Sequence, residues 1–232
     1  MTTAIILAGG LGTRLRNAVP NLPKPMAPVG GRPFLECLLD YWVNQGITRF
    51  VISVGYMKEV IMDHFGNSYK STPISYAIEE IPLGTGGGLL VAAHLIKEPF
   101  LVLNGDTFFE VDLSVLMKFH AEKSSDWTFS LFTTSESGRY MGMDIAVDGK
   151  INSLKSSVTE GARLANGGAY IVEPAVIEKS GFKLGEKISL EDDFLPVLIN
   201  KNCNLFGIEF KKNFIDIGVP EDYLRATEYL YK

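Results

Sequence analysis

The chain has 232 residues, of which 46% are hydrophobic and 21% are charged, and its formal net charge is −5. This length and apolar content suit one globular domain with a sizeable core. A negative net charge without any block of basic residues argues against a general nucleic-acid-binding protein. The two cysteines, Cys37 and Cys203, predict neither a disulfide framework nor a metal cluster.

The sequence shows no targeting or membrane segment. Its first apolar run, residues 4–8, is too short for the core of a signal peptide and has no basic leader. No apolar stretch approaches the ~20 residues that span a membrane. We therefore expect a cytoplasmic, reducing location with no membrane partner. Because no repeat or linker divides the chain, we expect a single domain over residues 1–232.

The first predicted element is a strand over residues 4–8 that leads into residues 7–16, which read LAGGLGTRLR. A short apolar run that ends in glycines is typical of a buried strand leaving a parallel sheet. The glycines let phosphate oxygens approach backbone amides, and Arg14 adds a planar cationic fork suited to phosphate. The stretch predicts a nucleotide triphosphate site, although a glycine-rich turn with a surface arginine explains the same residues.

Two better-known phosphate motifs do not fit this stretch. A Walker A loop would have Lys-Ser or Lys-Thr where Thr13 and Arg14 stand, and a dinucleotide fingerprint would have glycine at Leu15. Lys24 follows between two prolines, which predict extended backbone and no helix there. Lys24 would then point back at the glycine loop, unless it is a solvated lysine in a connector.

Helices and strands alternate along the rest of the chain, which predicts an α/β fold with a mostly parallel, mixed sheet flanked by helices. The predicted elements are a helix over 33–45, a strand over 49–54, a helix over 57–65, a strand over 74–79, a glycine loop over 82–88 with a helix through 96, a strand over 100–103, a helix after 112, a strand over 127–134, a hairpin over 144–154, a strand over 168–172, a helix over 190–199, strands over 205–210 and 214–218, and a last helix from 220.

Two aspartates could hold a metal ion. Asp106 and Asp216 each follow a short apolar strand, in the runs LNGD and FIDIG. The carboxyl end of a central strand is where open α/β sheets bind ligands, and carboxylates are the usual protein ligands of phosphate-bound magnesium. With the glycine loop the pair predicts a Mg²⁺ clamp, although each aspartate alone is better explained as a turn cap.

The glycine loop and the run PKPMAPVGGRPF (residues 23–34) closely resemble the start of the sugar-1-phosphate nucleotidyltransferases, and most of all their D-glycero-α-D-manno-heptose 1-phosphate guanylyltransferase branch. The resemblance spans nearly the whole chain. It implies a Rossmann-like fold of the glycosyltransferase-A-like type, with a nucleotide-binding half over 1–134 and a sugar-binding half over 135–232.

The resemblance also implies site residues. The implied catalytic residues are Arg14, Lys24 and Asp106. The implied nucleotide-binding residues are Leu7, Ala8, Gly9, Gly10, Gly12, Thr13, Arg14, Glu80, Gly84, Thr85, Gly86, Asn104 and Asp106. The implied sugar-binding residues are Gly105, Lys155, Asn166, Gly167 and Glu191, and the implied metal ligands are Asp106 and Asp216.

Two of these assignments depart from the family pattern or leave a choice open. Relatives carry a Glu-Lys-Pro triplet near residue 155, whereas this chain reads SLKSS, so Lys155 only substitutes for the usual lysine. No glutamine stands near the second glycine loop, and Glu79 or Glu80 could instead accept from the two donors of guanine, although either could be a solvated charge at a strand end.

The resemblance implies transfer of a guanylyl group from GTP to D-glycero-α-D-manno-heptose 1-phosphate, with Mg²⁺ as cofactor and pyrophosphate as the second product. Such a product would serve nucleotide-sugar and surface polysaccharide biosynthesis. A mannose 1-phosphate guanylyltransferase, a uridylyl enzyme and a non-catalytic nucleotide-sugar sensor stay open as alternatives. No nucleic acid is implied as a partner, and a homo-oligomer stays open.

Overall fold

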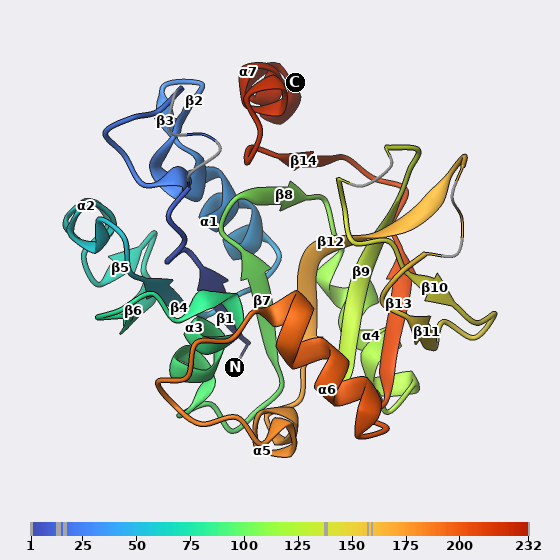
Figure 1. Ribbon diagram of the computed structural model, residues 1–232. Helices are drawn as coiled ribbons and strands as arrows, with labels where there is room; N and C mark the ends of the chain where they lie inside the picture. The colour runs from blue at the N-terminus through green and yellow to red at the C-terminus, as the bar shows by residue number, and fades with distance from the viewer. Residues whose placement is uncertain are drawn as a thin grey trace.

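The computed structural model describes residues 2–12, 15, 18–136, 139–156, 158 and 160–231, and an eight-stranded sheet runs through its centre (Figure 1). In spatial order its strands are β13 (Leu205–Glu209), β9 (Trp127–Thr134), β12 (Arg163–Val172), β7 (Phe100–Asn104), β1 (Thr3–Leu7), β4 (Arg49–Val54), β6 (Thr72–Ile78) and β5 (Ser68–Tyr69).

The sheet is mixed and mostly parallel, as the sequence predicts. Strand β1 pairs in parallel with β4 on one side and with β7 on the other, and β6 continues the parallel set. Strand β12 runs antiparallel to both of its neighbours, β7 and β9. Because β1 and β7 are parallel and Leu7 lies opposite Asn104, the two central strands end side by side. Their carboxyl ends therefore bring the first glycine loop next to Asp106.

Helices cover both faces of the sheet (Figure 1). They are α1 (Phe34–Asn44), α2 (Lys58–Phe65), α3 (Gly84–Ala93), α4 (Leu113–Glu122), α5 (Ala175–Ser180), α6 (Leu195–Asn200) and α7 (Pro220–Leu230), with short turns η1 (Lys24–Met26) and η2 (Leu190–Phe194). Within the described ranges, no helix is both long and apolar enough to cross a membrane.

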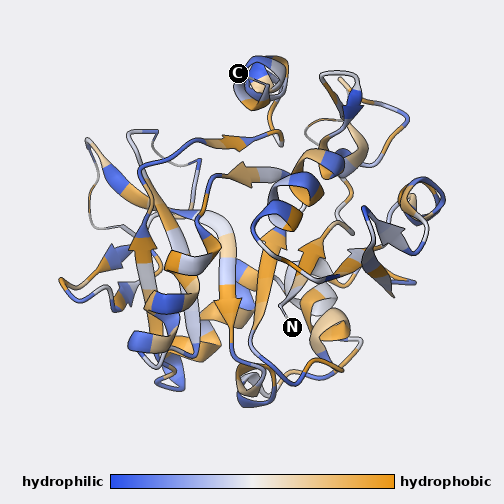
Figure 2. Ribbon diagram, turned by 180° about the vertical axis from the view of Figure 1, so that it is seen from behind, coloured by the Kyte–Doolittle hydropathy of each residue, from blue (hydrophilic) through white to orange (hydrophobic). Residues whose placement is uncertain are grey.

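Each face of the sheet has its own apolar core. Residues of α1, α2 and α4 pack on one face, whereas residues of α3, α5 and α6 pack on the other. Because side chains alternate along a strand, Ile6 of β1 enters the first core and Ile5 enters the second. Figure 2 shows the resulting concentration of apolar residues in the central strands. The sheet edge that carries the site is therefore a rigid platform.

Three short antiparallel pairs lie outside the central sheet. They are β2 (Pro28–Val29) with β3 (Arg32–Pro33), β10 (Asp144–Ile145) with β11 (Ile151–Ser153), and β8 (Thr107–Phe109) with β14 (Phe214–Asp216). The last pair sets Asp216 opposite Thr107, although more than a hundred residues separate them. This pairing brings the second aspartate to the end of β7.

Several local predictions are wrong. Lys24 is the first residue of the 3₁₀ turn η1, because a proline at the second position of a first turn loses no hydrogen bond. The second glycine loop is helical from Gly84 onward, since the amides of Gly86 and Gly87 donate to the carbonyl of Ile188. Strand β12 begins at Arg163, so the predicted sugar loop lies inside a strand at a register shift. The predicted helix over 190–199 begins with the π-helical turn η2.

Candidate active site

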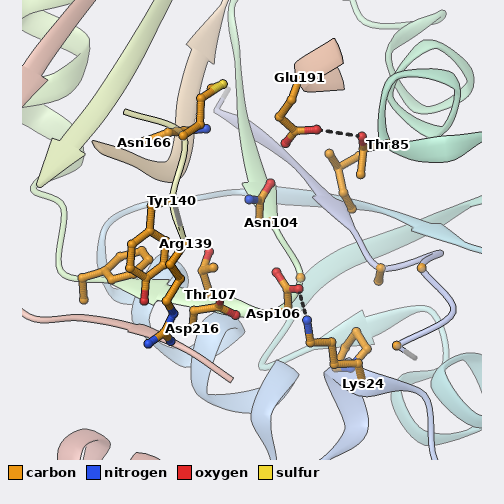
Figure 3. A pocket seen from close by; sticks show the side chains of 18 residues that line it. Lys24, Thr85, Asn104, Asp106, Thr107, Arg139, Tyr140, Asn166, Glu191 and Asp216 are labelled. Carbon is orange, nitrogen blue, oxygen red and sulfur yellow. Dashed lines mark hydrogen bonds and ion pairs between the residues drawn. The ribbon is translucent and has the colours of Figure 1, made fainter. Parts of the chain in front are cut away.

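A cavity of about 480 Å³, called the main cavity here, opens at the carboxyl ends of β1, β7 and β14 (Figure 3). Most of the residues implied by the sequence line it together. These are Leu7, Ala8, Gly10, Gly12, Lys24, Thr85, Asn104, Gly105, Asp106, Asn166, Glu191 and Asp216. The structure thus forms one pocket from seven separate stretches of the chain.

Other implied residues lie elsewhere. Gly9 and Glu80 border a separate cavity of about 180 Å³, and Lys155 lines a third cavity of about 520 Å³. Gly84, Gly86 and Gly167 are not among the residues that line the main cavity. Thr13 and Arg14 lie outside the described residues. The assignments of these residues to nucleotide, sugar or catalysis stay predictions.

The acidic end of the main cavity is built around Lys24. Its ammonium donates to Oδ2 of Asp106, and its side chain is only 10% exposed. The amide of Ile217 donates to the carbonyl of Asp106 at 3.0 Å, and the amide of Gly218 donates to Oδ1 of Asp216 at 2.6 Å. The end of β14 therefore ties both aspartates into one unit beside the lysine.

The two carboxylates suit a magnesium ion that arrives with phosphate ligands. In the part of the chain that the structure describes, no three His, Cys, Asp or Glu side chains come together as a metal site. Magnesium is usually held by one or two carboxylates, with water and substrate phosphates completing its ligand set. Asp106 and Asp216 therefore fit a metal that is bound jointly by protein and substrate.

Gly218 lies at the contact between Lys24 and Asp216, and the sequence alone does not indicate it as a site residue. A Cβ atom at Gly218 would lie 2.5 Å from Oδ1 of Asp216 and still closer to Nζ of Lys24. The position is buried. Glycine is therefore required by the close packing of the charged groups rather than by the backbone, because the site leaves no room for a methyl group.

We predict that Gly218→Ala lowers kcat by between about tenfold and 10²-fold, since displacement of a catalytic group by ~1 Å can cost about 10²-fold. Both obstructing atoms are ends of flexible side chains, so the fold should tolerate the methyl group. Steady-state kinetics with a thermal unfolding curve separates the two effects. Unchanged kcat in a folded variant would contradict the tight packing of Lys24 against Asp216.

Asn166 is held in one orientation in the lining of the main cavity. Its Nδ2 donates to the hydroxyl of Tyr170 at 2.7 Å, and its Oδ1 accepts from the amide of Gly168 at 3.1 Å. Complete burial raises the pKa of the Tyr170 hydroxyl, so that this group stays a neutral partner. Gly168 has φ of +75°, and a side chain there would meet Thr107 and Asn104. The network fixes Asn104 and Asn166 facing the cavity.

Glu191 stands between the main cavity and the third cavity, since it lines both. The hydroxyl of Thr85 donates to its Oε2 at 3.4 Å and accepts from the amide of Leu190 at 2.9 Å (Figure 3). Burial raises the pKa of Glu191, because desolvation disfavours the charged carboxylate. The group can therefore accept from, or in its neutral form donate to, a hydroxyl-bearing ligand.

The small cavity beside Gly9 distinguishes the two candidate glutamates. Glu79 is buried, and its two carboxylate oxygens accept from Ser53 Oγ at 2.8 Å and from the amide of Leu83 at 3.1 Å. The Glu80 side chain is 80% exposed and pairs with Lys58 at 3.1 Å. Both residues border the cavity, but Glu79 has the fixed orientation that recognition requires. Exposed and buried residues alternate from Ile78 to Glu79 to Glu80. This alternation is the signal in the sequence that could have identified Glu79, rather than Glu80, as the inward-facing glutamate.

Sequence reasoning also missed Arg139 and Tyr140, which line the main cavity opposite Lys24 (Figure 3). The guanidinium of Arg139 lies 4.8 Å from the centre of the Tyr140 ring. The loop that carries them has no periodicity and no glycine pattern that would single out these two residues. Pro25, Thr107, Met141 and Phe214 complete the set of lining residues that the sequence did not indicate.

Comparison with known proteins agrees with this geometry. The sequence profile of the family described as nucleotidyl transferase matches residues 3–232. A D-glycero-α-D-manno-heptose 1-phosphate guanylyltransferase of Aneurinibacillus thermoaerophilus is 40% identical over 228 residues, which cover 98% of this chain and 97% of the relative. The protein of the same description from Campylobacter jejuni is 39% identical, over 95% of this chain and 96% of its own.

A solved structure shares the fold. The crystal structure of HddC from Yersinia pseudotuberculosis complexed with GMP-PN superimposes with a TM-score of 0.85 at 35% sequence identity. The match covers 98% of this chain and 99% of HddC. The two folds therefore agree over nearly their full lengths.

Proposed function

Since the chain belongs to the nucleotidyl transferase family, we propose that it transfers a guanylyl group from GTP to D-glycero-α-D-manno-heptose 1-phosphate and releases pyrophosphate. The observation that carries this proposal is the convergence of the first glycine loop, Lys24, Asp106 and Asp216 on one cavity. The two relatives described as heptose 1-phosphate guanylyltransferases, and the GMP-PN complex of HddC, support guanine and heptose as the specific pair.

In the proposed reaction, an oxygen of the sugar 1-phosphate attacks the α-phosphorus of GTP, the bond to the α–β bridging oxygen breaks, and pyrophosphate leaves. The attacking oxygen is already anionic, so no general base is needed. Catalysis then depends on positioning and on charge neutralisation. The amides of the first glycine loop and Arg14 would hold the β- and γ-phosphates, and Lys24 would neutralise charge at the reacting phosphates.

Asp106 and Asp216 would hold Mg²⁺ in this reaction, with Asp106 more open to the cavity than the buried Asp216. When bound, Mg²⁺ supplies charge neutralisation on the phosphate oxygens. The two aspartates orient each other through the end of β14, because Ile217 and Gly218 fix the carbonyl of Asp106 and the carboxylate of Asp216. This arrangement supports a fixed pair of protein ligands, to which the substrate phosphates would add the rest of the ligand set.

The lining of the main cavity supports separate binding roles for the two halves of the chain, with the nucleotide bound by the first half and the sugar by the second. Leu7, Ala8, Gly10 and Gly12 belong to the proposed nucleotide-binding half. Asn166, Met141 and Glu191 belong to the proposed sugar-binding half, and Met141 and Glu191 also line the third cavity. The net charge of −5 supports small phosphorylated substrates, rather than nucleic acid, as partners. A cytoplasmic location is part of the same proposal.

Glu79, rather than Glu80, is proposed to recognise the guanine base. Its carboxylate already accepts two hydrogen bonds and has lone pairs left for the two donors on the edge of guanine. Glu79→Gln should therefore lower the preference for GTP over ATP by roughly tenfold to a hundredfold, the range for a lost hydrogen bond to a charged group. Glu80→Gln is the matched control and should leave the preference unchanged. A lower preference for GTP in Glu80→Gln but not in Glu79→Gln would assign base recognition to Glu80 instead.

One panel tests the proposed function. Purified protein with Mg²⁺ receives GTP, ATP, UTP or dTTP together with heptose, mannose or glucose 1-phosphate, and pyrophosphate release is measured. GTP with heptose 1-phosphate should give the highest kcat/KM, and the product should have the charge and mass of a GDP-heptose. A dominant UDP- or dTDP-sugar would overturn the guanylyl assignment. Absence of pyrophosphate in every combination would favour a nucleotide-sugar sensor.

A further inference from the structure

The main cavity has few cations for the substrates that the proposed function brings to it. Its charged lining within the described residues consists of Lys24 and Arg139 against Asp106, Asp216 and Glu191. A nucleoside triphosphate and a sugar phosphate add further negative charge to the same space. A buried or partly buried phosphate needs a nearby cation, because its desolvation is otherwise costly. Each cation in the lining therefore has a substantial electrostatic role.

Lys24 and Lys155 leave the side of the acceptor phosphate that faces away from the nucleotide without a cation. The ammonium of Lys24 is held by Asp106, at the nucleotide side of the cavity. Lys155, the residue that the sequence suggested for the sugar phosphate, lines the third cavity and not the main one. Its position lies beyond Tyr140 and Glu191, which separate the two cavities. Arg139 is therefore the remaining cation in the described lining.

Arg139 is fixed in place by groups outside the main cavity. Its Nη2 donates to Asp222 of α7, and its Nη1 donates to Glu136 at 2.8 Å. The Asp222 side chain is only 3% exposed and also pairs with Arg225 at 2.5 Å. Two guanidinium groups thus share one buried carboxylate, and Glu136 supplies the second negative charge of the cluster. The guanidinium also lies against the ring of Tyr140, which restricts its rotation.

The fork of Arg139 keeps donors for a ligand. A guanidinium has five N–H groups, and the two contacts above use one on each terminal nitrogen. Its Nε is buried and has no hydrogen-bond acceptor among the described residues, so the donors left for a ligand are the remaining N–H groups of the two terminal nitrogens. Figure 3 shows Arg139 and Tyr140 on the side of the cavity away from Lys24, and Asp216 lies between them and Lys24. A phosphate bound beside Asp216 would lie within reach of this fork.

We propose that Arg139 binds the 1-phosphate of the acceptor sugar, with Asp222 and Tyr140 as its positioning residues. The assignment rests on the proposed transfer reaction and adds a residue that touches its second substrate. Arg139 stays protonated throughout, since arginine does not lose its proton in proteins, and it therefore neutralises charge without taking part in proton transfer. Its planar fork would also orient the attacking oxygen toward the α-phosphorus.

The test compares Arg139→Gln and Arg139→Lys with Lys155→Met, the change at the alternative residue, and with Arg49→Gln as the matched control, since Arg49 is exposed at the start of β4. Arg139→Gln should raise the KM for heptose 1-phosphate roughly ten- to a hundredfold, as expected for a lost hydrogen bond to a charged group, and change the KM for GTP less than twofold. Arg139→Lys should recover part of the loss, because a point charge replaces only part of a bidentate contact. Arg49→Gln should leave the KM values for heptose 1-phosphate and GTP near those of the unmutated protein.

Calorimetric titration of heptose 1-phosphate into each protein separates this inference from the proposed function. Binding that is weakened by Arg139→Gln but not by Lys155→Met supports the inference, even if the unmutated protein releases no pyrophosphate. A selective loss in Lys155→Met would overturn it. An equal rise in both KM values with a lower unfolding temperature would show a structural role instead, and would also overturn it. No binding to the unmutated protein would overturn the inference and the proposed acceptor together.

Discussion

Asp106→Asn is expected to lower kcat on the order of 10³-fold, as the loss of a preorganised electrostatic group in an active site does. The change removes the charge of a proposed magnesium ligand while keeping the shape of the side chain, and the amide oxygen can still accept from Lys24. The fold should be intact, because the Asp106 side chain is 31% exposed in the cavity. Kinetics over a magnesium titration, with an unfolding curve, measures both effects.

Asp216→Asn should lower kcat by a similar factor. The double variant should have a kcat little below that of either single variant, because the effects of residues that act as one unit are strongly non-additive. Asp148→Asn, in the exposed turn between β10 and β11, is the control. Its activity should match that of the unmutated protein. Near-normal activity of Asp106→Asn at saturating magnesium would contradict the proposed two-aspartate site.

Lys24→Met is the change with the second largest expected effect, a loss in kcat on the order of 10²- to 10³-fold. The side chain is 10% exposed and points into the main cavity, so methionine keeps its packing and removes only its charge. The loss should appear mainly in kcat, because the charge is proposed to neutralise phosphates that become more negative as the reaction proceeds. Steady-state kinetics with both substrates varied measures the separate effects on kcat and KM.

Lys24→Arg should not restore activity, because the space beside the ammonium is limited by Gly218 and Asp216. Lys58→Met is a control, since this lysine forms an ion pair with the exposed Glu80 at the surface. Exposed pairs of this kind contribute little, about 0–1 kcal/mol. Full activity of Lys24→Arg would show that the site has more room than the structure indicates, and would weaken the proposed role of Gly218.

Some elements could be predicted well because local pattern decides them. The strands over 49–54 and 127–134 have the bounds that their apolar runs indicate. Helix α1 follows from its apolar stripe, which packs on the sheet face, and α4 begins after Asp112, whose side chain accepts from the amides of Ser114 and Val115. Periodicity and capping act over a few residues, so they are visible in the sequence.

The failures come from contacts between residues that are distant in sequence. Lys24 lies in a 3₁₀ turn packed under Asp106, and the glycines after residue 83 become helical because the segment around Ile188 caps them. Strand β12 is longer than predicted because β9 continues the pairing before the glycines, from Arg163 to Asn166. In α3 and β12 tertiary hydrogen bonds outweighed the local preference of glycine, whereas local hydrogen bonds close the turn at Lys24.

By itself the sequence determined the first glycine loop at the end of a buried strand, an α/β sheet, and two aspartates suited to magnesium, since each is encoded in a short run of residues. Only the tertiary structure decided which of these groups meet. The pairing of β8 with β14 sets Asp216 beside Asp106, the alternation after β6 buries Glu79 instead of Glu80, and α7 brings Asp222 to Arg139. These contacts join positions separated by many residues, and chain spacing does not reveal which distant side chains the packed sheet brings together.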